Sequence, residues 1–232
     1  MVARIIFSVL IACSIAAGIA LWRGAIEIPE RYDPWATLEL DAPPNFLTRY
    51  KLGRLSKDPR LCLEVLSTSP FRYEALHDRV TAQACGFFNA VRIEQTGSEV
   101  GEPFSLSCRA AVSLALWERH VLQPAALEHF RQSIARIEHY GSYSCRNVYG
   151  RPQATRSRHA TAEAFDVAGF VLADDTRIRV LGDWDNAGAQ GRFLREVRTG
   201  ACSFFDSVLS PDYNDAHRDH FHFDRGAYRM CR

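Results

Sequence analysis

The sequence predicts an α+β fold in which a small antiparallel sheet has helices packed on one side and disulfides stabilise the domain. Two observations lead to this prediction. The order of elements is helices first and mixed strands and helices afterwards, which is typical of α+β layouts rather than of alternating α/β folds. In addition, six of the seven cysteines lie outside the apolar N-terminal segment, and an even number suits disulfide bonding.

The composition is that of an ordinary globular protein. Of the 232 residues, 47% are hydrophobic and 24% are charged, and the net charge is +1. These values exclude a disordered chain and leave enough residues for one domain with a real core. The near-neutral net charge argues against a nucleic-acid binder, and the basic run 151–158 is too short to change this conclusion. We expect no nucleic-acid partner, and a chain that acts as a monomer.

The N-terminus predicts export. Residues 5–22 are apolar and are bracketed by Arg4 and Arg23, so that residues 1–23 form a transmembrane anchor or a signal. We favour the anchor, because the apolar run is long for a signal and has no clear cleavage site. Residues 24–50 are rich in proline and lack helical periodicity, which predicts a linker before a domain over 51–232. The alternative is a packed arm, because Trp35, Leu38 and Leu40 are apolar.

Apolar periodicity predicts the helices of the domain. They cover residues 57–69, 104–121, 124–132 and 189–198. The clearest is 104–121, where Leu106, Ala110, Leu114 and Trp117 form one stripe. Pro103 suits its start, and Pro124 opens the helix that follows.

Short apolar segments predict the strands. Residues 133–144 form one strand, 165–172 and 177–181 form a hairpin around Asp174 and Asp175, and 220–224 form the last strand. Residues 81–95 are ambiguous and include some strand.

The cysteines indicate an oxidising compartment. Cys13 lies in the apolar segment, which leaves six cysteines for three disulfides. Six cysteines allow about 15 pairings. Our expectation is the sequential set, which is Cys62–Cys85, Cys108–Cys145 and Cys202–Cys231.

A histidine cluster over residues 217–222 is the strongest sign of chemistry. His220 and His222 point to the same face of a strand, because side chains alternate along strands. Such a pair begins either a metal site or an acid/base site. The alternative is a polar surface turn that is rich in histidine.

A second segment supplies partners for a metal. His159 and Asp166 are seven residues apart, and Ala160, Ala162 and Ala164 between them suit a tight turn against a core. Asp166 begins an apolar strand, where a carboxylate is costly to bury unless it is paired or binds metal. One histidine and one aspartate here, with one histidine of the cluster, make a three-ligand site with an open position, as in catalytic zinc centres.

These motifs resemble those of known families. Ser157-x-His159, Asp166 and His217-x-Asp219-His220-x-His222 resemble the LAS (M15) group of zinc peptidases, which includes D-Ala-D-Ala carboxypeptidases and penicillin-insensitive murein endopeptidases. Over residues 43–232 the chain is closer to the bacterial extensin-like C-terminal domain family. The matching segments are Cys108-Arg109-Ala110, Gly141 to Arg146, Asp166 to Phe170, Pro211-x-Tyr213-Asn214 and Cys231-Arg232.

The resemblance implies a role for each site residue. It implies Zn²⁺ held by His159, Asp166 and His222, with a water as the fourth ligand. His217 or His220 is the base, and Asp219 supports a ligand histidine or competes for the role of base. Ser157 binds substrate, Arg146 polarises the scissile carbonyl or holds a carboxylate, and Arg158 is its rival. The chain has Arg158 where relatives often have glutamate and Glu163 where they have glycine.

The function that the resemblance implies is that of a zinc metallopeptidase of the LAS type. It hydrolyses amide bonds of peptidoglycan stem peptides or cross-links, as an endopeptidase or a carboxypeptidase. Its partners are peptidoglycan and, through the N-terminal helix, the bacterial inner membrane, with the domain facing the periplasm. The alternative is a non-catalytic module that keeps the fold and binds the cell wall or a metal.

Overall fold

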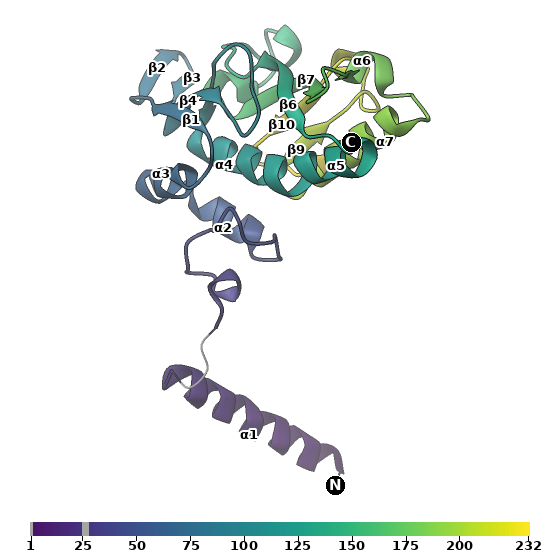
Figure 1. Ribbon diagram of the computed structural model, residues 1–232. Coiled ribbons are helices and arrows are strands. Elements are labelled where there is room, and N and C mark those ends of the chain that lie inside the picture. The colour runs from purple at the N-terminus through teal and green to yellow at the C-terminus, as the bar shows by residue number, and fades with distance from the viewer. Residues whose placement is uncertain (1, 25–27) are drawn as a thin grey trace.

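A mostly antiparallel sheet forms the second half of the domain. The computed structural model describes residues 2–24 and 28–232 (Figure 1). The strands of this central sheet are β6 (Ile134–Gly141), β7 (Ala164–Leu172), β8 (Arg177–Arg179), β9 (Ser207–Leu209), β10 (Phe221–Asp224) and β11 (Met230–Cys231). Their order is β11-β9-β10-β7-β6, and β8 pairs with the part of β7 beyond β10. Only β9 and β11 run parallel among these strands. The expected strands and hairpin are confirmed, whereas β9 and β11 were not predicted.

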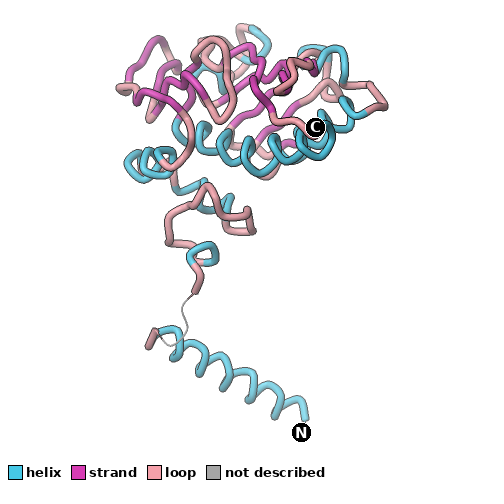
Figure 2. The backbone as a smooth tube through the Cα atoms, viewed as in Figure 1, coloured by secondary structure: helices cyan, strands magenta, loops and turns pink. Residues whose placement is uncertain are grey.

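The helices α4 (Cys108–Trp117), α5 (Gln123–Phe130) and α7 (Ala189–Ala201) cover one face of this sheet. Figure 2 shows these helices lying below the strands. The Trp117 ring packs against Phe223 at 5.1 Å and Phe170 at 6.2 Å between ring centroids. Phe193 of α7 reaches Phe170 at 5.3 Å. The apolar faces of helices and sheet therefore share one core, and the expected α+β class is confirmed.

The helix predicted over 104–121 begins later than expected. Phe104–Ser107 is strand β5, which pairs with β4 (Ala90–Gln95), and β4 pairs in turn with β1 (Arg72–Ala75). Phe104 and Leu106 alternate with serines, so their pattern fits a strand as well as a helix. Ser107 then caps α4, because its Oγ accepts a hydrogen bond from the backbone N–H of Ala110. After α4 the helix continues through a π-helical turn, Glu118–Leu122, into α5.

The remaining elements are short helices and strands around these layers. Helix α3 (Pro59–Ser67) confirms the helix expected over 57–69. The ambiguous segment 81–95 consists largely of strands, because it overlaps the hairpin of β2 (Arg79–Ala82) and β3 (Cys85–Phe87) and includes β4. The strand predicted over 177–181 ends at Arg179, and α6 (Val180–Asp183) follows it.

The N-terminal segment contains helix α1 (Val2–Trp22). Residue 1 of the expected anchor and residues 25–27 of the expected linker lie outside the described residues. Within the part of the chain that the structure describes, no helix combines the length and the apolar character that a membrane crossing requires.

Much of the segment expected as a linker packs on the domain. Leu38 and Leu40 are buried in the main core, whereas Trp35 is exposed. Lys51 of helix α2 (Thr48–Arg54) donates from Nζ to the carbonyl of Glu30 at 2.8 Å. Arg54 donates to the carbonyls of Pro34 and Trp35. Residues 28–50 thus match the alternative of a packed arm.

Two of the three expected disulfides are wrong. The structure pairs Cys62 with Cys108, Cys85 with Cys145, and Cys202 with Cys231. Helix α3 packs on α4, so that Cys62 and Cys108 meet between two helices. Strand β3 reaches the segment after β6, so that Cys85 meets Cys145. The third pair is confirmed, and the correction follows from packing between segments that are far apart in sequence.

Glu118 is a buried carboxylate in the π-helical turn, and it provides a first testable prediction. Its oxygens accept hydrogen bonds from Ser98 Oγ at 2.7 Å and Gly97 N–H at 3.0 Å. Burial raises its pKa above the ordinary value despite these bonds. When folding raises the pKa of a carboxyl group, that group favours the folded state at low pH. Its contribution to the free energy of unfolding is lost as pH rises from the unfolded-state pKa through the folded-state pKa. Glu118→Gln should therefore be less stable than wild type at pH 4 and recover relative to it by pH 7. Urea unfolding across this range tests the prediction, and a pH-independent difference contradicts it.

Candidate metal centre

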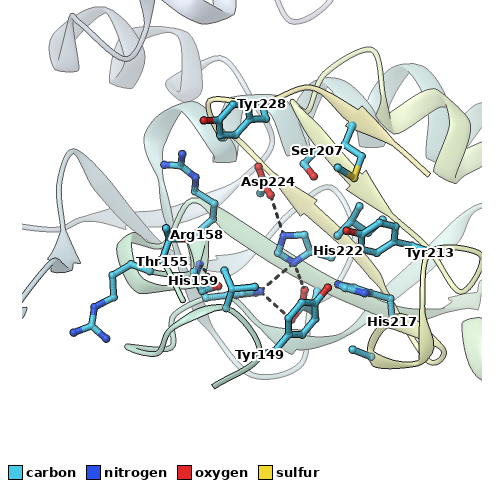
Figure 3. A pocket seen from close by; sticks show the side chains of 18 of the residues that line it. Tyr149, Thr155, Arg158, His159, Ser207, Tyr213, His217, His222, Asp224 and Tyr228 are labelled. Carbon is cyan, nitrogen blue, oxygen red and sulfur yellow. Dashed lines mark hydrogen bonds and ion pairs between the residues drawn. The ribbon is translucent and has the colours of Figure 1, made fainter. Parts of the chain in front are cut away.

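A cleft of about 910 Å³ opens where β7 and β10 run side by side. Residues 146–159 line one part of it and residues 207–230 line another (Figure 3). Eight of the nine expected site residues line this cleft, namely Arg146, Ser157, Arg158, His159, Asp166, His217, His220 and His222. The ninth, Asp219, contacts His220 from outside the cleft lining. The structure therefore brings the expected site together.

Three potential ligands converge in the cleft. His159 Nε2 lies 3.1 Å from His222 Nδ1 and 3.2 Å from Asp166 Oδ2, and His222 Nδ1 lies 2.9 Å from Asp166 Oδ1. They are the one group of potential metal ligands of this kind among the described residues. Zinc–ligand bonds of about 2.0–2.2 Å around one ion place ligand atoms about this far apart. Two imidazoles and one carboxylate also match the donor set of catalytic zinc.

Strand pairing and a short turn position these ligands. Asp166 on β7 and His222 on β10 are directly opposite in the antiparallel pair, so their side chains share a face. His159 lies on the 3₁₀ turn Arg158–Thr161, whose first backbone N–H groups need a cap. Ser157 supplies it, because its Oγ accepts a hydrogen bond from the N–H of His159 at 3.3 Å. Ser157 therefore holds the turn as well as lining the cleft.

Each histidine ligand has a second partner on its other ring nitrogen. His159 Nδ1–H donates to the carbonyl of Ser142 at 2.5 Å, which turns its Nε2 toward the cluster. His222 Nε2–H donates to Asp224 Oδ2 at 3.1 Å, which turns its Nδ1 toward the cluster. Metal-bound histidines are commonly oriented by such partners. Sequence reasoning missed Asp224, although a residue two positions after His222 on a strand falls on the same face.

The charges of the cluster support one another. Burial alone would raise the pKa of Asp166, but hydrogen bonds from His159 and His222 outweigh burial and lower it. Burial opposes the charge on His222, but its hydrogen bonds to Asp166 and Asp224 raise its pKa to about 9. The cluster thus holds positive charge beside the Asp166 carboxylate, and a bound cation would supply the same charge.

The other two histidines flank the three ligands. His220 Nδ1–H donates to Asp219 Oδ1 at 2.9 Å, and its Nε2 lies 3.7 Å from Asp166 Oδ1. His217 Nδ1–H donates to Asn214 Oδ1 at 2.8 Å. Burial, followed by the charges of His222 and His220, lowers the pKa of His217 to about 4. Asp219 therefore supports His220 and does not support a ligand histidine as expected.

The arginines differ in how firmly they are held. Arg158 Nη1 pairs with Glu163 Oε2 at 3.2 Å, and Arg109 Nη2 pairs with Glu163 Oε1 at 3.1 Å. Glu163 thus binds two guanidinium groups. Arg146 is exposed at the cleft and has no side-chain hydrogen bond or ion pair within the described residues.

Three tyrosines also line the cleft, and none of them was predicted as a site residue. They are Tyr149, Tyr213 and Tyr228 (Figure 3). Tyr149 accepts a hydrogen bond from Asn214 Nδ2 at 2.9 Å, which joins the two sides of the cleft. Tyr213 lies in a segment that matches the extensin-like family, whereas no local pattern pointed to Tyr149 or Tyr228.

Comparison with known proteins places this geometry in a family. A family profile described as Extensin-like protein C-terminus matches residues 60–232, which include every residue of the candidate site. No curated protein and no solved structure matches the chain. The match covers well over half of the chain and confirms the extensin-like resemblance. The chain belongs to the extensin-like protein C-terminus family.

Proposed function

We propose that the protein is a zinc-dependent hydrolase that cleaves amide bonds in the stem peptides or cross-links of peptidoglycan. We include in this proposal that the protein is related to the LAS zinc peptidases. One observation carries it: His159, Asp166 and His222 converge within an open cleft that two further histidines line. A structural zinc site would be closed by four protein ligands, whereas three ligands leave a position open.

The donor set fits zinc. His159 Nε2, Asp166 and His222 Nδ1 would hold the ion, and the outer partners of both imidazoles are already in place. A zinc ion bound there would supply a Lewis acid that activates water and polarises a carbonyl.

His220 is the residue we assign as general base. Asp219 Oδ1 accepts its Nδ1–H, so Nε2 is the nitrogen left to accept a proton. Asp219 is less suited to act as the base, because both of its carboxylate oxygens already accept hydrogen bonds, Oδ1 from His220 and Oδ2 from Tyr140 at 3.4 Å. Neutral His217, held by Asn214 at Nδ1, presents Nε2 as a hydrogen-bonding group for the substrate.

Arg146 is the residue we assign to the substrate. Its guanidinium has no protein partner among the described residues, so it is available to a carboxylate or carbonyl oxygen of a peptide. Arg158 is less available because Glu163 already binds it.

The disulfides support a site of action outside the cytoplasm. Three disulfides persist in an oxidising compartment such as the bacterial periplasm, where peptidoglycan lies. We therefore propose that the domain acts in the periplasm.

Incubation of the zinc-loaded protein with cross-linked sacculi tests the function. Mass analysis of the released muropeptides should show dimers converted to monomers for an endopeptidase, or stem peptides shortened by one residue for a carboxypeptidase. Protein that pellets with sacculi and releases nothing would identify a wall-binding module instead.

His220→Ala provides the prediction that separates catalysis from metal binding. Loss of a general base should lower kcat by about 10²-fold or more. Zinc content should stay at the wild-type level, because His220 is not among the three ligands. Elemental analysis and sacculus hydrolysis on the same preparation check both points. Hydrolysis at the wild-type rate would remove His220 from the mechanism.

A further inference from the structure

We propose that Asp224 is a positioning residue that selects which nitrogen of His222 binds the metal. This inference rests on the metal site of the proposed function, but it does not depend on the reaction that the site performs. Figure 3 shows Asp224 and His222 joined by a hydrogen bond in the wall of the cleft.

Both ring nitrogens of His222 face a carboxylate, and the contact with Asp224 favours one assignment of the ring when a metal is bound. Both residues lie on β10 two positions apart, so their side chains share a face of the strand. Asp224 Oδ2 accepts the Nε2–H of His222 at 3.1 Å, which leaves Nδ1 unprotonated and directed at the other ligands in the neutral ring. Asp166 Oδ1 and His159 Nε2 then lie 2.9 and 3.1 Å from that Nδ1.

His159 shows the opposite arrangement. The carbonyl of Ser142 occupies its Nδ1, so that its Nε2 joins the cluster. The two imidazoles therefore contribute different nitrogens, and in each case the outer partner makes the choice. Without Asp224, His222 would lose the acceptor that favours the Nε2–H tautomer.

The side chain of Asp224 has no other evident task. It is 8% exposed, and His222 is its one side-chain partner within the described part of the chain. Its second oxygen, Oδ1, is buried without a hydrogen-bond partner among the described groups. Burying a carboxylate with one oxygen unsatisfied is unfavourable. A role in folding alone does not explain such a group, whereas orientation of a metal ligand does.

Gly226 leaves room for this carboxylate. A Cβ on Gly226 would lie 2.7 Å from Asp224 Oδ1 and 3.2 Å from Arg158 Nε. Gly226→Ala therefore displaces the Asp224 carboxylate without removing it. This substitution gives a second means of testing the inference.

Zinc affinity is the decisive measurement. Competition with a chromophoric chelator, well below the melting temperature of each full-length variant, should show Asp224→Ala binding zinc about 10–100-fold more weakly than wild type. Asp224→Asn keeps an acceptor oxygen and should lose less, and Gly226→Ala should weaken binding in the same direction. The ¹⁵N shifts of His222 should report a protonated Nε2 in zinc-bound wild type.

Asp219→Asn is the matched control, because Asp219 holds a histidine outside the three ligands. Its zinc affinity should equal that of wild type.

Asp224 variants that melt at a lower temperature yet bind zinc with wild-type affinity would show a merely structural role and overturn the inference. If Asp224→Ala does not fold, Asp224→Asn and Gly226→Ala decide. Wild-type protein that takes up no zinc would refute the metal site and this inference together, whereas zinc binding without sacculus cleavage would refute the hydrolase alone.

Discussion

Replacing His222 with alanine is expected to abolish zinc binding and peptidoglycan hydrolysis together. His222 is one of the three proposed ligands, and its Nδ1 lies within 3.1 Å of both others. Its loss removes a direct ligand, so zinc affinity should fall by more than the 10–100-fold that loss of an outer partner costs. Hydrolysis should fall to the background rate, because in the proposed function a bound zinc ion would supply the Lewis acid. Elemental analysis after gel filtration and muropeptide release from sacculi measure the two effects.

His77→Ala is the control for this experiment. His77 is exposed and lies outside the cleft lining, so its removal should change neither zinc content nor hydrolysis. Circular dichroism of His222→Ala should match wild type, which separates metal loss from unfolding. Hydrolysis that survives in folded His222→Ala would show that the cleft described here is not the active site.

Breaking the Cys85–Cys145 disulfide is expected to lower both stability and zinc affinity. The bridge closes a loop of 60 residues. Loop-closure entropy then predicts a loss of about 4 kcal/mol in the free energy of unfolding when both cysteines become serine. Cys145 lies three residues after Ser142, whose carbonyl orients His159. Loosening this segment should therefore turn His159 away from the cluster and weaken zinc binding in the protein that is still folded.

The Cys62–Cys108 disulfide provides a matched control. It closes a loop of 46 residues, so its removal should cost a similar free energy, again about 4 kcal/mol. Neither cysteine lines the cleft, so zinc affinity per folded molecule should stay near the wild-type value. Equal zinc affinity in the two double-serine variants would contradict the proposed link between Cys145 and His159.

Local patterns predicted the parts of the site that lie close together in sequence. The residue pattern predicted a site made of His159, Asp166 and one histidine of the cluster, and the resemblance to zinc peptidases implied that this histidine is His222. The structure brings these three side chains together in one cleft. Ser157 was expected to bind substrate, and the structure shows it lining the cleft and capping the turn of His159. Asp219 was expected to support a ligand histidine, and it supports His220 instead.

Features that depend on packing were not predictable in the same way. The pairing of Cys85 with Cys145 requires β3 to meet the segment after β6, and no local pattern encodes that contact. The sequence pattern around Phe104 and Leu106 fits a helix and a strand equally well, and this segment is a strand because it pairs with β4. Residues 28–50 carried linker composition, yet Leu38 and Leu40 are buried in the main core.

The pairing of Asp166 with His222 across β7 and β10 makes the site a check on strand alignment. A slip of one residue would place Phe221 or Phe223 opposite Asp166 and direct a phenyl ring into the cleft. A misaligned chain could not assemble the three ligands, so zinc would bind the correctly aligned chain selectively. A ligand that binds only the native state stabilises it by mass action, so the ion would also favour the correctly aligned chain over a misaligned one. Such a metal would then act both in the reaction and in selecting the correct strand alignment. Both roles would depend on the facing pair of Asp166 and His222.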